Sequence, residues 1–456
     1  MSELPQGWTE VTVADVIESF QAGFASGEKD VDDGLPHLRM QNIGVDGELD
    51  LSLLRRVPRS LASSRHFLKH GDVLVCTTNS GKLVGKTALF ALEDCFAFSN
   101  HLTRLRPLSG VVDSRYLHRI LQSLWLQGVY EGISKHWVNQ SSVPKEELLA
   151  LRIPLPPRQE QVRIVEQLEQ VLTRVDACRA QLERVPALLK RFRQSVLAAA
   201  CSGRLTEDWR EGFDEDDQGI PSTWQRVRLG DLLVSLSYGT AVRCSYDPIG
   251  VPVLRIPNVC DGRITQDNLK YGELSESERM KLALVPGDLL MVRSNGSVSL
   301  IGRTAIVTQA EQGYAYAGYL VRLRIRHDIL NPTYLHLTLS SYDIRDQIEI
   351  PARSTSGVNN INSTEIKRLS MLLPPIEEQH EIVRRITALF ALADRLEARY
   401  MQAKQHIDRL PQSILAKAFR GELVPQDPND EPAAVLLARI QRERGDKHGS
   451  PRRRSK

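Results

Sequence analysis

The chain has 456 residues, of which 41% are hydrophobic and 25% are charged, and its formal net charge is +3. This length exceeds one ordinary core and predicts two or three domains of a soluble globular protein. No run approaches the roughly 20 apolar residues that a membrane helix needs, so no membrane partner is expected, and the start MSELPQGWTE lacks the pattern of a secretory signal. The six cysteines show no C-x-x-C pair and no histidine at ligand spacing. This excludes an obvious metal site or disulfide framework and predicts a cytoplasmic location.

The small net charge of the whole chain conceals two strongly charged segments. Residues 207–217 hold seven acids against Arg210, and we predict a solvated acidic linker over 206–219. Residues 439–456 hold eight bases against two acids. The C-terminal tail, 425–456, is therefore predicted to be basic and partly disordered, with a short helix near 433–444. Such a tail is usually a solvated end, and contact with nucleic acid is the less frequent alternative.

An internal repeat is the observation on which the predicted fold depends. Landmarks in residues 1–157 return in residues 220–375 at offsets of 216 to 218, beginning with Trp8 and Trp224. The recurring segments are LPHLRMQN (35–42) and VPVLRIPN (251–258), GDVLVCTTNS (71–80) and GDLLMVRSNG (287–296), GKTA (85–88) and GRTA (302–305), and FAFSNHLTRLR (96–106) and YAYAGYLVRLR (314–324). Short β-rich runs between turn signals, with helices predicted after Asp113 and Asn331, indicate a mixed α/β domain in each half.

Each half ends in two prolines and a long apolar seam. PPRQEQ (156–161) opens the first seam and PPIEEQ (374–379) the second, and apolar positions then alternate at spacings of 4 and 3. This spacing is typical of a helix that buries a narrow stripe against another helix. We predict coiled-coil helices over 158–205 and 376–424, paired within the chain because a covalent link raises their effective concentration above that of a homodimer.

The seam residues predicted to form the coiled coil or to dock a partner are Ile164, Leu168, Val171, Val175, Leu182, Leu189, Ile382, Ile386, Leu389, Leu396, Ile407 and Ile414. Pro186 and Pro411 interrupt the two copies at different places, which predicts a kink or a two-piece helix in each.

Polar and basic side chains at matching positions of the two halves are the candidate DNA contacts. Arginine and asparagine can bond base edges in pairs, whereas lysine, serine and threonine suit phosphates. The candidates are Arg39, Asn42, Thr78, Asn79, Ser80, Lys82, Lys86, Arg255, Asn258, Arg293, Ser294, Asn295, Ser297 and Arg303. The alternative is a framework role, in which asparagine and serine cap turns and Arg39 and Arg255 pair with an acid inside the domain.

Enzyme motifs are poorly matched, so no catalytic residue is predicted. The segment from Gly81 to Thr87 resembles a phosphate-binding loop that is one residue short, and its repeat partner from Gly296 to Thr304 is one residue long. The segment from Asn331 to Tyr334, NPTY, lacks the second proline of an adenine-methyltransferase turn. Its repeat partner DSRY has no proline, which favours a helix cap used twice. No histidine grouping supports hydrolytic chemistry.

The two tryptophan-started α/β units, the PPRQEQ and PPIEEQ openings, and the helix ends QSVLAAACSGRL (194–205) and QSILAKAFRGEL (412–423) resemble the specificity subunit of type I restriction–modification systems over nearly the whole chain. The resemblance implies an α/β (α+β) tandem repeat: two mixed α/β target recognition domains separated by two long helices that form an antiparallel coiled coil. Each domain would read one half of an asymmetric bipartite site in double-stranded DNA.

The resemblance also implies that this chain is not itself an enzyme. Two methyltransferase (modification) subunits would dock on the helices and transfer a methyl group to adenine N6, and restriction/translocase subunits would cleave. S-adenosylmethionine, ATP and Mg would bind in those partners, with no cofactor in this chain. The alternatives are a self-contained DNA methyltransferase or NTP-binding enzyme, or a coiled-coil adaptor without DNA contact.

Overall fold

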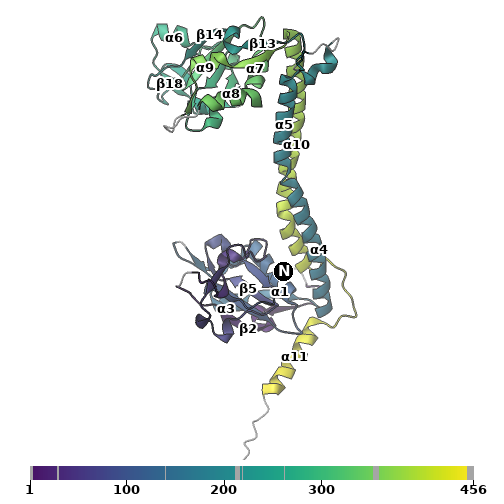
Figure 1. Ribbon diagram of the computed structural model, residues 1–456. Coiled ribbons are helices and arrows are strands. Elements are labelled where there is room, and N and C mark those ends of the chain that lie inside the picture. Colours follow the sequence, from purple (N-terminus) through teal and green to yellow (C-terminus); the bar gives the residue numbers. More distant parts are fainter. Residues whose placement is uncertain are drawn as a thin grey trace, which may run out of the picture. The chain divides into compact units, whose positions relative to one another are not determined.

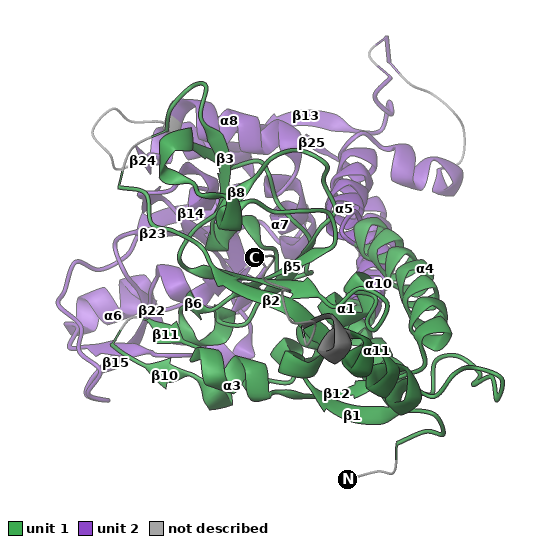
Figure 2. Cartoon of the chain, turned by 90° about the horizontal axis from the view of Figure 1, so that it is seen from below, with its two compact units in different colours: residues 1–182, 402–456 green, residues 183–401 purple. Residues whose placement is uncertain are grey.

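The computed structural model describes residues 4–27, 30–138, 140–210, 216–217, 219–260, 262–352 and 359–448. Residues 211–215 and 218 of the predicted acidic linker and the last eight residues of the basic tail lie outside the described residues. The chain divides into two compact units (Figure 2): unit 1 combines Met1–Leu182 with Gln402–Lys456, and unit 2 is Glu183–Met401. Each unit therefore holds one half of the repeat and a part of both helical segments.

The α/β domain of unit 1 is built on a four-stranded antiparallel sheet in the order β2-β9-β5-β7. The strands are β2 (Ile17–Ala22), β9 (Leu102–Pro107), β5 (Asp72–Cys76) and β7 (Thr87–Phe90). A smaller sheet has the order β4 (Arg55–Val57), β3 (Leu35–Leu38) and β8 (Ala97–Phe98). All five residues of β5 are buried, as expected for a central strand, and α1 (Ser114–Leu126), capped by Asp113, packs on the sheet.

Unit 2 repeats the strand order of these two sheets. Its four-stranded sheet has the order β14 (Leu233–Tyr238), β23 (Leu320–Ile325), β19 (Leu289–Val292) and β21 (Thr304–Ile306). Its smaller sheet has the order β18 (Lys270–Gly272), β15 (Val251–Leu254) and β22 (Ala315–Tyr316), and α7 (Pro332–Leu339) takes the place of α1. The predicted tandem repeat of mixed α/β domains is confirmed.

The seams form α4 (Arg158–Leu182) and α5 (Val185–Cys201) in the first copy and α10 (Ile376–Phe419) in the second (Figure 1). Pro186 lies in the first turn of α5, where its missing N–H costs no hydrogen bond, so the two-piece helix predicted there is confirmed. Pro411, in contrast, lies inside the unbroken α10. The short helix predicted in the tail is α11 (Ala433–His448).

Ion pairs show that the helices run antiparallel within each unit. In unit 2, Arg193 of α5 pairs with Asp394 at 2.6 Å, whereas Asp208, later in the first copy, pairs with Arg385, earlier in the second. In unit 1, Arg179 of α4 faces Asp408 of α10 at 3.6 Å, whereas Arg163, earlier in α4, pairs with Asp430, which follows α10. Apart from Arg163–Asp430, these pairs are solvent-exposed and each contributes at most about 1 kcal/mol, so most of the stabilisation comes from the apolar seam.

The seam is buried largely as predicted. The buried members are Ile164, Leu168, Val175, Leu189, Ile382, Ile386 and Ile407, and the half-buried members are Val171, Leu182, Leu389 and Ile414. Leu396 differs, because its side chain is 43% exposed. The next residue, Glu397, accepts a hydrogen bond from Arg193, so a polar pair occupies the place at which an apolar contact was predicted.

A fully buried glutamine fixes the start of each long helix. The side-chain amide of Gln161 donates to the carbonyls of Val111 and Pro156, and its oxygen accepts from the backbone N–H of Asp113 at 2.8 Å. Gln379 makes the same three bonds, to the carbonyls of Ile329 and Pro374 and from the N–H of Asn331 at 2.8 Å. Each glutamine thus ties a helix start to the loop that caps α1 or α7.

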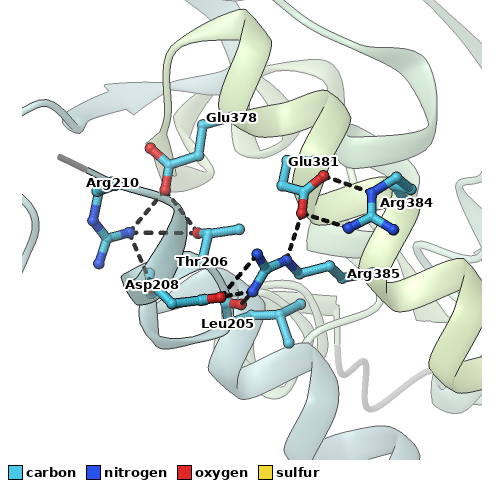
Figure 3. A network of polar contacts seen from close by, with 9 residues as sticks. Leu205, Thr206, Asp208, Arg210, Glu378, Glu381, Arg384 and Arg385 are labelled. Atoms are coloured by element: carbon cyan, nitrogen blue, oxygen red, sulfur yellow. Dashed lines mark hydrogen bonds and ion pairs between the residues drawn. The ribbon is translucent and has the colours of Figure 1, made fainter.

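The glutamate before each glutamine is buried in a different setting. Glu378 accepts from the Trp224 indole at 2.8 Å. It also accepts from Thr206 and Arg210, both at 2.7 Å (Figure 3). In unit 1 the repeat places Val424 where unit 2 has Thr206.

Glu160 is the counterpart of Glu378, and one of its carboxylate oxygens has no hydrogen-bond partner among the described residues. Burial raises the pKa of Glu160, partly offset by Trp8 and Arg163.

This difference predicts opposite effects of exchanging one side chain between the copies. Thr206→Val removes a donor from Glu378 and should lower the free energy of unfolding by about 1 kcal/mol, whereas Val424→Thr offers a donor to Glu160 and should raise it by a similar amount. Because the new donor favours the charged carboxylate, it should lower the pKa of Glu160, and the gain in stability should shrink as the pH falls through the raised pKa that Glu160 has in the unmodified protein. Calorimetric unfolding at pH 7 and pH 4 measures both effects; destabilisation by Val424→Thr at pH 7 would contradict the assignment.

Candidate nucleic-acid interface

A basic cavity lies beside the smaller sheet of unit 1, with a volume of about 370 Å³. Arg39, which follows β3, and Arg55, on β4, line it together with Asn100 and His101 from the loop before β9. Burial, and then the charge of Arg55, lower the pKa of Arg39. Two guanidinium groups that face one cavity repel each other, and a bound anion relieves that repulsion.

The matching cavity of unit 2 has a volume of about 590 Å³ and is also basic. Arg255 stands in the place of Arg39, and Lys270 in the place of Arg55, because Val253 pairs with Lys270 as His37 pairs with Arg55. Arg243 and Tyr319 are also among its lining residues.

Aromatic rings accompany these cations in unit 2. Tyr246, 63% exposed, lies 4.8 Å from the Lys270 ammonium and 5.7 Å from the Arg255 guanidinium, measured to its ring centroid. The Arg293 guanidinium lies 4.4 Å from the ring centroid of Tyr238. Cations next to exposed aromatic rings can hold phosphates and stack on bases.

Two candidate asparagines belong to the domain framework. Asn42 is fully buried, accepts from the backbone N–H of Arg39 at 2.9 Å and donates to the carbonyl of Asp50. Asn258 makes the equivalent bond from the N–H of Arg255 at 2.9 Å. These bonds close the turn after the strand. Both asparagines therefore have the framework role that was the alternative to DNA contact, and their side chains do not reach the surface.

Arg39 and Arg255 combine a framework role with a position suited to DNA contact, the two alternatives that the sequence left open. Arg39 donates from its guanidinium to the carbonyl of Leu53 at 2.9 Å, and Arg255 donates to that of Asn268 at 2.6 Å. Both are anchored by a backbone carbonyl, neither forms an ion pair with an acid among the described residues, and both line the cavities.

Lys86 requires a correction. Its side chain is buried, and its ammonium donates to the carbonyls of Met40, at 3.2 Å, and Ile43. Burial lowers the pKa of this ammonium. A group held inside the domain is not available to a DNA phosphate, so Lys86 is part of the framework. Its repeat partner Arg303 is only half-buried and lines a separate cavity of about 600 Å³ together with Arg193 and Arg345.

The remaining candidates lie on two equivalent loops that follow central strands. In unit 1, β6 (Thr78–Asn79) leads to Ser80 and Lys82, both exposed. Asn79 caps this turn by accepting from the N–H of Ser80 at 2.8 Å, and Asn295 accepts from that of Ser297 at 2.9 Å.

In unit 2 the corresponding strand is β20 (Ser294–Asn295), and Ser297 is exposed. The turns are therefore built from the asparagines, while lysine and serine side chains stay at the surface.

Several cavity residues were missed in the sequence. Arg55 and Lys270 lie at an offset of 215, outside the landmarks found at 216 to 218, and only the strand register aligns them. His101 and Tyr319 end the recognised segments FAFSNH and YAYAGY, so position in the repeat, combined with their side-chain types, was an available signal.

Comparison with known proteins agrees with this duplicated arrangement. Residues 5–186 and 221–403 each match the family described as the type I restriction modification DNA specificity domain. The chain is 33% identical to the type I restriction enzyme EcoKI specificity subunit of Escherichia coli strain K12, over 100% of this chain and 99% of that protein. It is 32% identical to the StySPI specificity subunit of Salmonella potsdam, with the same coverage.

Among solved structures, the HsdS subunit from Thermoanaerobacter tengcongensis is similar in fold, with a TM-score of 0.63, 20% identity, and coverage of 92% of this chain and 98% of that chain. A chain from a study of type I R-M complex assembly and conformational transition gives a TM-score of 0.69 at 20% identity, with coverage of 92% of the present chain and 100% of that chain.

The present chain belongs to the type I restriction–modification DNA specificity family, and it resembles that family's specificity subunits along its whole length. Across the part of the chain that the structure describes, no helix combines the length and the apolar character of a membrane span.

Charge reversal distinguishes the exposed Lys82 and the half-buried Arg293 from the buried Lys86. Lys82→Glu and Arg293→Glu should each weaken binding to target DNA on the order of tenfold and lower the slope of log K against log salt by about 1. Lys86→Met serves as the matched control: it should destabilise unit 1 and leave that slope unchanged. Fluorescence anisotropy titrations over a salt series provide the measurement. Unchanged binding by both charge reversals would favour the adaptor without DNA contact.

Proposed function

We propose that this chain is the DNA-reading specificity subunit of a type I restriction–modification complex and that it recognises an asymmetric bipartite site. The observation that carries the proposal is the pair of equivalent basic cavities, each beside the smaller sheet of one recognition domain. Each domain would read one half-site, with phosphate contacts supplying most of the affinity.

The two halves differ where they would touch bases. The cavity of unit 1 presents His101 where unit 2 presents Tyr319, and the loop after the central strand reads CTTNSGK in the first half and VRSNGSV in the second. Imidazole and phenol offer different donors, acceptors and stacking surfaces. We therefore infer that the two half-sites have different sequences, which is why the whole site is asymmetric.

The partners follow from the relatives. Related proteins are named as subunits of type I restriction enzymes, and this chain would likewise direct separate methyltransferase and restriction subunits to its site. In this proposal two methyltransferase subunits carry S-adenosylmethionine and methylate adenine N6, and the restriction/translocase subunits use ATP and Mg, all in the cytoplasm. The chemistry on a base requires that the partner flip it out of the duplex.

Mapping methylated adenines tests the proposal most directly. Expression of this chain with its methyltransferase subunits, in a host lacking other adenine methyltransferases, should produce N6-methyladenine at one bipartite motif with an unread interval of constant length. Long-read sequencing detects the modified positions genome-wide, and a host with the methyltransferase alone is the control. Methylation at a short continuous motif, or the same motif without this chain, would contradict the proposal.

The helices supply a second prediction. Since the antiparallel pair would set the interval between half-sites, inserting seven residues into both α4 and α10 at facing positions keeps each seam in register and lengthens the pair by roughly 10 Å. The methylated motif should keep both half-site sequences and change only its interval. A change in half-site sequence, with the interval preserved, would show that the helices do not set the spacing.

A further inference from the structure

The first recognition domain carries an apolar pair at the tip of a β-hairpin. The hairpin consists of β10 (Lys135–His136) and β11 (Ser141–Ser142), and the pair is Trp137 and Val138. Trp137 is 61% exposed and Val138 is 98% exposed, the highest value among the large hydrophobic side chains that the structure describes. Two adjacent apolar side chains that protrude into water from one hairpin tip are a candidate contact for a partner.

The hairpin is firmly attached to the loop that carries the candidate DNA contacts. Strand β11 pairs antiparallel with β6, with Ser141 opposite Asn79 and Ser142 opposite Thr78. The next residue, Val143, is buried and its N–H donates to the carbonyl of Thr77 at 2.9 Å.

Two bonds also close the hairpin itself. The His136 ring nitrogen Nδ1 lies 2.8 Å from Ser141 Oγ, and the N–H of Trp137 donates to the carbonyl of Gln140 at 2.8 Å. The apolar tip is therefore held in place beside the surface of Ser80 and Lys82, and that continuity favours the same partner for both.

The second half lacks this apolar pair in its sequence. Asn359 pairs with Asn295 as Ser141 pairs with Asn79, which gives an offset of 218 for these strand residues. At that offset Trp137 and Val138 correspond to Thr355 and Ser356, which lie outside the described residues. The apolar pair distinguishes one recognition half from the other and is no requirement of the shared framework.

We propose that Trp137 and Val138 form a wedge that inserts between adjacent base pairs of the half-site read by the first recognition domain; this rests on the proposed function. An indole and a branched aliphatic side chain have the shape and chemistry to replace base–base stacking at one step. The exposed Lys135 and His136 beside them suit the flanking phosphates. The wedge unstacks only the first half-site, which makes that half sensitive to the flexibility of its base steps.

Transplanting the sequence of the second half tests the wedge. The double variant Trp137→Thr/Val138→Ser, assembled with its methyltransferase subunits, should bind a labelled duplex carrying the mapped site roughly 5- to 100-fold more weakly than the unmodified complex. Because no charge is removed, the slope of log K against log salt should stay unchanged, unlike that of Lys82→Glu. Trp137→Phe should retain most of the affinity. Tyr342→Thr, which removes another exposed aromatic side chain (70%) from unit 2, is the matched control and should change nothing.

A probe in the DNA locates the effect. 2-Aminopurine placed at successive positions of the first half-site, away from the methylated adenine, should brighten at one step with the unmodified complex and stay dark with the double variant. Probes in the second half-site should respond equally to both proteins.

Unchanged affinity of the double variant overturns the wedge, and so does loss of its methyltransferase subunits on size exclusion, which would identify the tip as a protein contact. If the unmodified complex fails to prefer the mapped site over a scrambled duplex, the proposed function itself fails, and the wedge with it.

Discussion

Two buried glutamines determine how each recognition domain is joined to its helix. Gln161 and Gln379 each use the amide donors and the carbonyl oxygen of a single side chain to bind three backbone groups from two segments. No shorter or charged side chain supplies that set of two donors and one acceptor at this reach. Because both glutamines are fully buried, losing any of these bonds would leave an unpaired polar group inside the protein. The recurring P-P-x-x-E-Q sequence therefore marks the place at which each long helix is fixed to its α/β domain.

The same principle explains why the two halves diverge at the surface yet keep one topology. Arg104 donates to the carbonyls of Arg65 and Phe67, and its repeat partner Arg322 donates to those of Lys281 and Ala283. Framework contacts of this kind end on backbone carbonyls, so they do not depend on which side chains the neighbouring positions carry. Residues that face the cavities can then change freely, which is the property that a reader of variable sequences needs.

The architecture could be predicted well from the sequence because each structural pattern occurs once in each half of the chain. Periodic seams, paired landmarks and a cap at Asp113 and Asn331 each gained weight from a second occurrence, and the structure confirms the tandem α/β domains and the antiparallel helices. Individual side chains were harder to place. Lys86 and Arg303 share one position in the repeat, but only the folded chain shows that one points into the interior and the other into a cavity.

Strand register and helix rotation account for the other differences. Lys270 aligns with Arg55 only through the pairing of β15 with β18, since the intervening loops differ in length. Leu396 satisfied the apolar period, yet the Arg193–Glu397 contact turns that side of the helix toward solvent. An internal repeat shows which positions of the two halves are equivalent. Whether a side chain at such a position is buried depends on long-range packing, which a local sequence pattern does not predict.

The division into units has a consequence for synthesis on the ribosome. Unit 2 is one continuous stretch, Glu183–Met401, whereas unit 1 needs Gln402–Lys456 to cover its core. Phe419, near the end of α10, packs edge-on against Tyr116 with ring centroids 5.4 Å apart. The nascent chain must therefore carry an unfinished first unit, with the apolar face of α4 uncovered, while more than two hundred further residues are translated. The half that is made first is the half that is completed last, and during that interval its uncovered apolar surface is open to aggregation.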